Sequence, residues 1–214
     1  MTVHNLGAPP SISSQFLSEL RDPLRQTDRL RFRHNLALLG TIMGYEISKT
    51  LPHKTETIKT GLGDKIMQIP VGEVVLLTIL RAGLPFMDGF QRIFSQADVG
   101  FIGAYRVEGK AELTIEAGYI AAPQLDGKSV ILVDTMLATG KSLTETLRLI
   151  KNYGEPEHLH LASVIAAPEG IRHLTESISQ PASIWTFAID EKLNEDYYIV
   201  PGLGDAGDLS FGPK

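Results

Sequence analysis

The sequence predicts an α/β fold with a mostly parallel central sheet flanked by helices. Apolar runs rich in Val, Ile and Leu, typical of strands buried on both faces, occur at residues 74–80, 99–105, 129–133, 159–166 and 183–189. Segments with helical character separate several of them, at residues 86–94, 140–151 and 171–177. Strands that alternate with helices in this way favour parallel pairing.

The first clear element is an amphipathic helix over residues 28–49, for which Thr27 is the expected N-cap. Its apolar residues recur at spacings of three and four and would share one face: Phe32, Leu36, Leu39, Met43 and Ile47. The polar, alternating residues 55–60 that follow suit an exposed edge strand or a hairpin.

Residues 107–124 differ from the apolar runs around them. Leu113, Ile115 and Tyr119 alternate loosely among Glu, Gly and Lys, which predicts a protruding β-hairpin or flap. No linker, repeat or break in composition divides the chain, so residues 1–214 are expected to form a single domain.

Bulk composition narrows the classes of function. With 43% apolar and 21% charged residues, the 214-residue chain has ordinary globular composition. Its net charge of −5 and lack of a basic run argue against nucleic acid as a partner. The absence of cysteine excludes disulfides and thiolate chemistry. No signal pattern or long apolar stretch occurs, so we expect a cytoplasmic protein without a membrane partner.

The most informative segment is residues 129–142, where an apolar strand ends in Asp134 and runs through a turn into a helix. Ligands of parallel sheets bind beyond the carboxyl ends of the strands. A phosphate there would meet free N–H groups at the helix start, together with the hydroxyls of Thr139 and Ser142. Asp134 would repel a phosphate and is expected to pair with sugar hydroxyls. The segment therefore predicts a site for a phosphorylated sugar.

Two better-known phosphate motifs do not fit. Gly140-Lys141-Ser142 resembles the end of a Walker A loop, but the glycine required five positions before the Gly-Lys pair is Thr135. Residues 202–207 match the Gly-x-Gly-x-x-Gly dinucleotide pattern, but too few residues follow to build a βαβ unit. The paired His158 and His160 lie on a predicted strand and are interpreted as structural or exposed, not as metal ligands.

The turn resembles the signature of the type I phosphoribosyltransferases. Three further blocks, at residues 80–89, 104–106 and 198–208, resemble the uracil phosphoribosyltransferase family in the same order along the chain. Residues 21–46 and 166–171 fit the family as well, so the likeness covers nearly the whole sequence. It implies the type I phosphoribosyltransferase fold, with a flap near residues 107–124 and a small C-terminal base-binding hood near residues 190–214.

The resemblance implies an enzyme of pyrimidine salvage, a pentosyltransferase that makes UMP and diphosphate from uracil and 5-phospho-α-D-ribose 1-diphosphate. Two alternatives remain open. One is a non-catalytic relative that binds nucleotides as a sensor or regulator. The other is a phosphoribosyltransferase for a different base, because pocket shape cannot be read from the sequence.

The resemblance also implies residue roles. Arg106 and Asp205 would be catalytic, and uracil would contact Ile199, Gly204, Asp205 and Ala206. The phosphoribosyl donor would contact Arg81, Arg106, Asp134, Thr135, Met136, Leu137, Ala138, Thr139, Gly140, Lys141, Ser142 and Asp205. Arginine suits such a donor because its planar fork matches phosphate oxygens.

No protein metal cage is expected, because Mg²⁺ can be held mainly by the substrate diphosphate and water. The family likeness also implies a homo-oligomer, dimer or tetramer, and GTP as an effector. The chain departs from the family pattern at two positions of the turn, with Thr135 where Pro is usual and Lys141 where Gly is usual. The flap also lacks the acidic sequence that commonly follows Tyr-Arg in the family.

Overall fold

The computed structural model describes residues 1–106 and 115–213. Within them, the main sheet has the strand order β1-β11-β9-β7-β4-β5-β6. All neighbouring strands are parallel except the β5–β6 pair. In spatial order the strands are β1 (Thr2–Asn5), β11 (Ala182–Thr186), β9 (His158–Ala162), β7 (Ser129–Val133), β4 (Val74–Leu80), β5 (Asp98–Arg106) and β6 (Ile115–Ala121). The predicted α/β class is confirmed.

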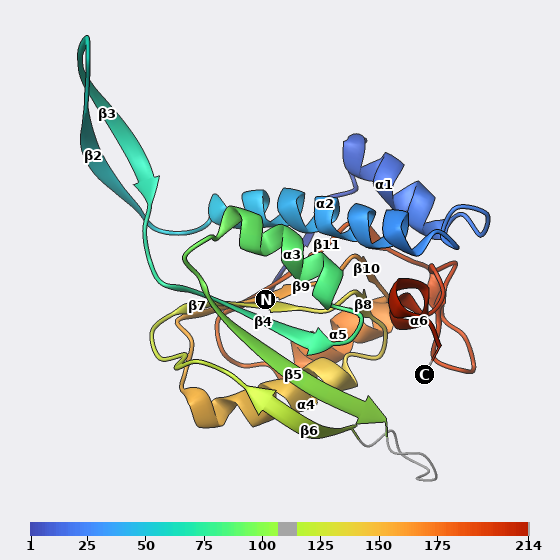
Figure 1. Ribbon diagram of the computed structural model, residues 1–214. Helices are drawn as coiled ribbons and strands as arrows, with labels where there is room; N and C mark the ends of the chain where they lie inside the picture. The colour runs from blue at the N-terminus through green and yellow to red at the C-terminus, as the bar shows by residue number, and fades with distance from the viewer. Residues whose placement is uncertain (107–114, 214) are drawn as a thin grey trace.

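Helices cover both faces of this sheet (Figure 1). One face carries α1 (Ile12–Arg21), α2 (Arg29–Ser48) and α3 (Leu84–Ile93), and the other carries α4 (Lys141–Ile150), a 3-10 turn (Lys151–Tyr153) and α5 (Pro168–Ser177). Side chains of β7 alternate between the two layers: Ile131 and Val133 pack beneath α2, whereas Val130 and Leu132 pack against α4. These four residues are fully buried, which explains the unbroken apolar run in the sequence.

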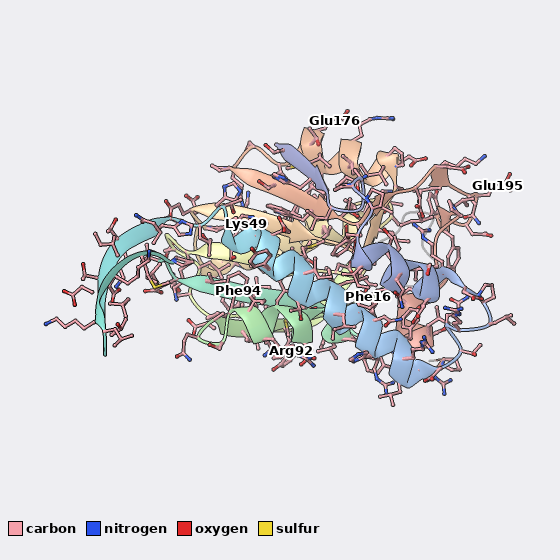
Figure 2. The ribbon with its side chains drawn as sticks, turned by 90° about the horizontal axis from the view of Figure 1, so that it is seen from above. Phe16, Lys49, Arg92, Phe94, Glu176 and Glu195 are labelled. Carbon is pink, nitrogen blue, oxygen red and sulfur yellow. The ribbon has the colours of Figure 1, made fainter. Side chains whose placement is uncertain are left out.

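Smaller elements complete the fold. A second parallel sheet joins β8 (Met136–Leu137), β10 (Ile165–Ala166) and β12 (Ala188–Ile189). The C-terminal hood contains the antiparallel pair β13 (Lys192–Leu193) and β14 (Ile199–Val200), followed by α6 (Ala206–Phe211). The hairpin of β2 (His53–Thr60) and β3 (Gly63–Pro70) projects away from the body (Figure 1). Figure 2 shows Lys49 at the hairpin end of α2 and Glu195 at the opposite end of the molecule.

The predicted long helix is confirmed, and all five of its apolar marker residues are buried. The sequence suggested Thr27 as the N-cap of this helix, but the structure shows that the N-cap is Asp28. The Asp28 carboxylate accepts a hydrogen bond from the Arg31 N–H at 3.1 Å, whereas the Thr27 hydroxyl donates backwards to the Leu24 carbonyl. The prediction of a hairpin at residues 55–60 is also confirmed.

Two predicted strands were too long. The run at 159–166 breaks after Ala162, because Ser163 bonds to the Trp185 carbonyl and Val164 to the Thr135 carbonyl. The chain then enters the small sheet as β10, and residues 183–189 divide in the same way between β11 and β12. Their apolar pattern is continuous because the residues on both sides of each break are largely buried.

The flap prediction needs a partial correction. Residues 115–121 form β6, an antiparallel edge strand of the main sheet, and not part of a separate flap. Residues 107–114 lie outside the described residues. The elements β1, α1 and α6 were not predicted at all, since each is short and lacks a long periodic pattern.

The histidine pair is structural, as predicted. His160 is buried and accepts a hydrogen bond from the Trp185 indole at 3.2 Å. Burial lowers the pKa of His160 to about 3, so this ring is neutral in the folded protein. In the described ranges, no helix combines the length and the apolar character needed to cross a bilayer.

Candidate functional site

The site lies where the helical connections switch from one face of the sheet to the other. β4 and β7 are neighbours, yet the helices that follow them, α3 and α4, cover opposite faces. Such a switch point leaves a crevice beyond the carboxyl ends of the two strands, where parallel sheets bind ligands. Arg81 directly follows β4 and Asp134 directly follows β7. Two residues 53 positions apart in sequence are thus brought to one edge.

The turn after β7 encloses a cavity of about 160 Å³. All nine residues predicted for the donor turn line it: Asp134, Thr135, Met136, Leu137, Ala138, Thr139, Gly140, Lys141 and Ser142. Ala82, Leu143 and Tyr197 complete the lining. The residues predicted from one continuous segment therefore do form one concave surface.

Gly140 is the position in the turn that requires glycine. It has φ +78° and caps α4, and a Cβ there would lie 3.1 Å from both the Gly170 carbonyl oxygen and the His173 ring. Lys141 is the exposed first residue of α4 and does not have a positive φ. The departure at Lys141 therefore leaves the backbone of the turn intact and adds a cation at its rim.

The other departure from the family pattern is Thr135, and the structure gives its side chain a role. Its side chain is fully buried, and its hydroxyl donates to the Ala82 carbonyl at 2.8 Å. Thr78, inside β4, similarly donates to the Val133 carbonyl at 3.1 Å. These bonds fix the turn after β7 against the segment that carries Arg81.

Asp134 has an unusual environment for a carboxylate. It is half-buried at the mouth of the cavity, and burial raises its pKa to about 6, although backbone N–H groups of Thr135 and Met136 act in the opposite direction. The Thr135 N–H lies 2.7 Å from Oδ1. The group is thus ionised at neutral pH with few partners of its own, as suits an acceptor for ligand hydroxyls.

Arg81 connects the two halves of the site. Its Nη2 donates to Asp208 Oδ1 at 3.1 Å and to the Gly212 carbonyl at 3.2 Å, both in the C-terminal segment. Its Nε is buried and has no partner within the described residues. A buried donor without a partner is costly unless a ligand oxygen satisfies it. Arg106 ends β5, and its side chain lies outside the part that the structure describes.

The predicted base-binding residues lie together in the hood. Asp205 is exposed and caps α6, accepting from the Asp208 N–H at 2.9 Å. Gly204 is exposed with φ +89°, whereas Ala206 and the side chain of Ile199 are buried. The glycine-rich segment is thus a turn followed by a short helix, where the sequence indicated a loop alone.

A partly buried ion pair supports this hood. Arg21 of α1 forms a two-pronged pair with Asp190 at 2.7 and 2.8 Å and also donates to the Gly202 carbonyl at 2.8 Å. Asp190 in turn accepts from the Gly202 N–H at 2.9 Å. Because the Asp190 side chain is only 6% exposed, the pair holds the start of the predicted base-binding turn firmly.

We expect Asp190→Ala to lower the free energy of unfolding by about 2–4 kcal/mol, because Arg21 would lose its buried partner. KM for the base should rise while KM for the phosphoribosyl donor stays within about twofold, since the donor turn is not touched. Chemical unfolding and steady-state kinetics measure both. Asp88→Ala, which breaks an exposed pair with Arg92, is the matched control. Equal losses in both variants would contradict the supporting role.

Sequence reasoning missed several residues of this site, and two of them come from the hood. Asp208 pairs with Arg81 across 127 positions, and Tyr197 lines the donor cavity. Neither belongs to a local pattern that indicates contact with the donor turn. The only available signal was the predicted convergence of residues 80–89 and 198–208 on one site.

Residues 10–213 match the family model for uracil phosphoribosyltransferase. The chain belongs to the uracil phosphoribosyltransferase family. A family member from Porphyromonas gingivalis is 42% identical over the full length of both chains. Another from Pyrococcus furiosus is 42% identical and covers 92% of this chain and 85% of its own. Both relatives carry the family name, and the similarity to the first spans the whole chain, including the donor turn and the hood.

Solved structures agree on the architecture. The AQ2163 protein from Aquifex aeolicus superposes with a TM-score of 0.86 at 33% identity, covering 99% of this chain and 98% of that one. TT1426 from Thermus thermophilus, at 15% identity and a TM-score of 0.51, shares the fold alone over 82% of this chain and 94% of its own.

Proposed function

We propose that this protein transfers a ribosyl phosphate to uracil, forming UMP and diphosphate from uracil and 5-phospho-α-D-ribose 1-diphosphate. A bond forms between the base nitrogen N1 and the anomeric carbon, the bond from that carbon to diphosphate breaks, and N1 loses its proton. The observation that carries the proposal is the convergence of the donor turn, Arg81 and the hood at one switch point, in a chain of this family.

In this proposal the turn at Asp134–Ser142 holds the ribose and its 5-phosphate. The start of α4 offers free N–H groups to the phosphate, Thr139 and Ser142 add hydroxyl donors, and Lys141 adds positive charge at the rim. Asp134 accepts hydrogen bonds from ribose hydroxyls. The cavity of about 160 Å³ and its polar lining support this assignment.

Arg81 and Arg106 bind the diphosphate and neutralise the charge that develops as it departs. The unpartnered Nε of Arg81 supports this role, since a diphosphate oxygen would satisfy it. The exposed Asp205 carboxylate orients the reactants and stabilises positive charge at the anomeric carbon.

Uracil binds at Ile199, Gly204, Asp205 and Ala206. Uracil has two carbonyl acceptors and ring N–H donors, which main-chain groups can pair edge to edge. The left-handed Gly204 supports this mode, because the backbone there can approach a flat ligand without a side chain in the way.

Mg²⁺ accompanies the donor in this proposal. In residues 1–106 and 115–213 there is no group of three or more His, Asp or Glu side chains that could hold a metal ion. The donor set fits an ion that takes most of its ligands from the diphosphate, ribose hydroxyls and water, with Asp134 or Asp205 nearby. Bound Mg²⁺ would offset negative charge on the diphosphate.

A homo-oligomer, dimer or tetramer, belongs to the same proposal. The projecting hairpin exposes Leu62, Ile66 and Met67, whose apolar surface suits a second copy of the chain. A cytoplasmic location and GTP as an effector rest on the family resemblance alone. The two alternative functions are a nucleotide sensor and a phosphoribosyltransferase for another base. The following assay distinguishes both from the proposed function.

The test is a steady-state assay with Mg²⁺, the phosphoribosyl donor and a panel of uracil, cytosine, adenine, guanine and hypoxanthine. We expect turnover with uracil and a kcat/KM at least about 10³-fold lower for the other bases, because unpaired buried polar groups reject a wrong base strongly. Turnover with another base instead would change the substrate. Donor binding without turnover on any base would favour the sensor.

A further inference from the structure

Tyr197 stands out from the rest of the described chain in its backbone. Its φ is +63°, and it is the only non-glycine with a positive φ in residues 1–106 and 115–213. An aromatic residue rarely adopts this conformation, because its Cβ crowds the backbone. Such a conformation persists only where the surroundings impose it.

The loop that carries Tyr197 is built to hold this conformation. The Asn194 side-chain oxygen accepts hydrogen bonds from the N–H groups of Asp196 at 3.1 Å and Tyr198 at 2.8 Å. The Asn194 main chain bonds to Tyr198 as an N–H donor and to Tyr197 as a carbonyl acceptor. Four hydrogen bonds to one residue fix the turn between β13 and β14.

This turn presents Tyr197 to the donor cavity. Tyr197 comes from the hood yet lines the same cavity as residues 134–143. It is the one aromatic residue in that lining and remains 52% exposed, so its side chain is not consumed by core packing. Glu195, labelled in Figure 2, marks this loop at the end of the molecule away from the hairpin.

Part of the remaining lining consists of small or hydroxyl-bearing residues, Ala138, Thr139, Gly140 and Ser142, beside the apolar Met136 and Leu137. An aromatic ring offers such a cavity a flat wall against the C–H face of a sugar, and a phenol hydroxyl can donate to a phosphate or ribose oxygen. Two residues after Tyr197, Ile199 begins the proposed base-binding segment. The loop therefore connects the donor cavity to the base pocket.

We propose that Tyr197 is a specificity-determining residue for the phosphoribosyl donor, covering the sugar phosphate with its ring and donating a hydrogen bond from its hydroxyl. This inference rests on the proposed function for the identity of the donor. It adds a contact from the hood to the donor turn.

Tyr197→Gly tests the inference without straining the fold, because glycine adopts φ +63° freely. We expect the donor KM to rise about tenfold, the donor Kd from calorimetry without base to rise equally, and the uracil KM to stay within about twofold. The melting temperature should not fall. Tyr197→Phe keeps the ring and should raise the donor KM only about threefold. Tyr45→Ala, at another half-exposed tyrosine on α2, is the matched control and should change neither constant.

An unchanged donor Kd and KM in Tyr197→Gly would overturn the inference. A rise in the uracil KM alone would also overturn it and assign Tyr197 to the base pocket. The proposed function fails separately: wild-type protein without turnover on any base would refute it, while a weaker donor Kd in Tyr197→Gly would still support the role of Tyr197.

Discussion

Asp134→Asn is expected to lower kcat/KM for UMP formation by about 10²- to 10³-fold, because a neutral amide replaces the carboxylate that we propose accepts hydrogen bonds from the ribose. The substitution is nearly isosteric, so the cavity of the donor turn should keep its shape. Steady-state kinetics with varied donor measures the loss. Asp88→Asn, an exposed carboxylate on α3, provides the control. Activity within threefold of wild type would remove Asp134 from the site.

The same variant should be more stable than wild type at neutral pH. The folded-state pKa of Asp134, about 6, lies above the ordinary value of 3.8, so the fold opposes ionisation of this group. Stability that the protonated group provides is present below about pH 4 and is lost as pH rises through 6. Asn cannot ionise, and the melting temperature of the variant should exceed that of wild type by roughly 2–4 °C at pH 7.5. This difference should shrink towards pH 5. A variant less stable at pH 7.5 would contradict the assigned burial.

Arg81→Lys is the second substitution with a large expected effect. Lysine keeps the charge but loses the planar fork and the Nε donor, which is buried without a partner. We expect kcat/KM for the donor to fall about 10- to 100-fold, with KM for uracil changed by less than about threefold. Donor binding measured by calorimetry should weaken in parallel.

Two companion variants separate the contribution of Arg81 from that of its ion pair. Asp208→Asn removes the partner of Arg81 but leaves the guanidinium in place, and the pair is too exposed to add much stability. Arg92→Lys changes an exposed arginine on α3 and should leave kinetics unchanged. A loss in Asp208→Asn as large as that in Arg81→Lys would mean that the arginine serves the hood and not the diphosphate.

The donor turn was predictable from the sequence because its parts are contiguous. Strand, carboxylate, glycine and helix start lie within 14 residues, and each residue type has a local reason for its place. The structure brings all nine predicted turn residues to one cavity. The α/β class was predictable for a similar reason, since buried parallel strands have a simple apolar pattern.

What was missed depends on contacts between distant segments. The split of residues 159–166 into β9 and β10 follows from bonds to Trp185 and Thr135, which no local pattern shows. Tyr197 and Asp208 reach the donor side only because the hood packs over the switch point. The choice of Asp28 over Thr27 as a cap is a local exception, because the Thr27 hydroxyl finds its acceptor three residues earlier, at the Leu24 carbonyl.

The most direct test of the account is to measure UMP and diphosphate together in one reaction of the purified wild-type protein with Mg²⁺, the donor and uracil. If the turn, Arg81 and the hood form one transfer site, the two products should appear in equal amounts and only when uracil is present. Diphosphate without UMP would show donor cleavage by water and contradict the placement of the base. Formation of neither product would contradict the proposed transfer reaction itself.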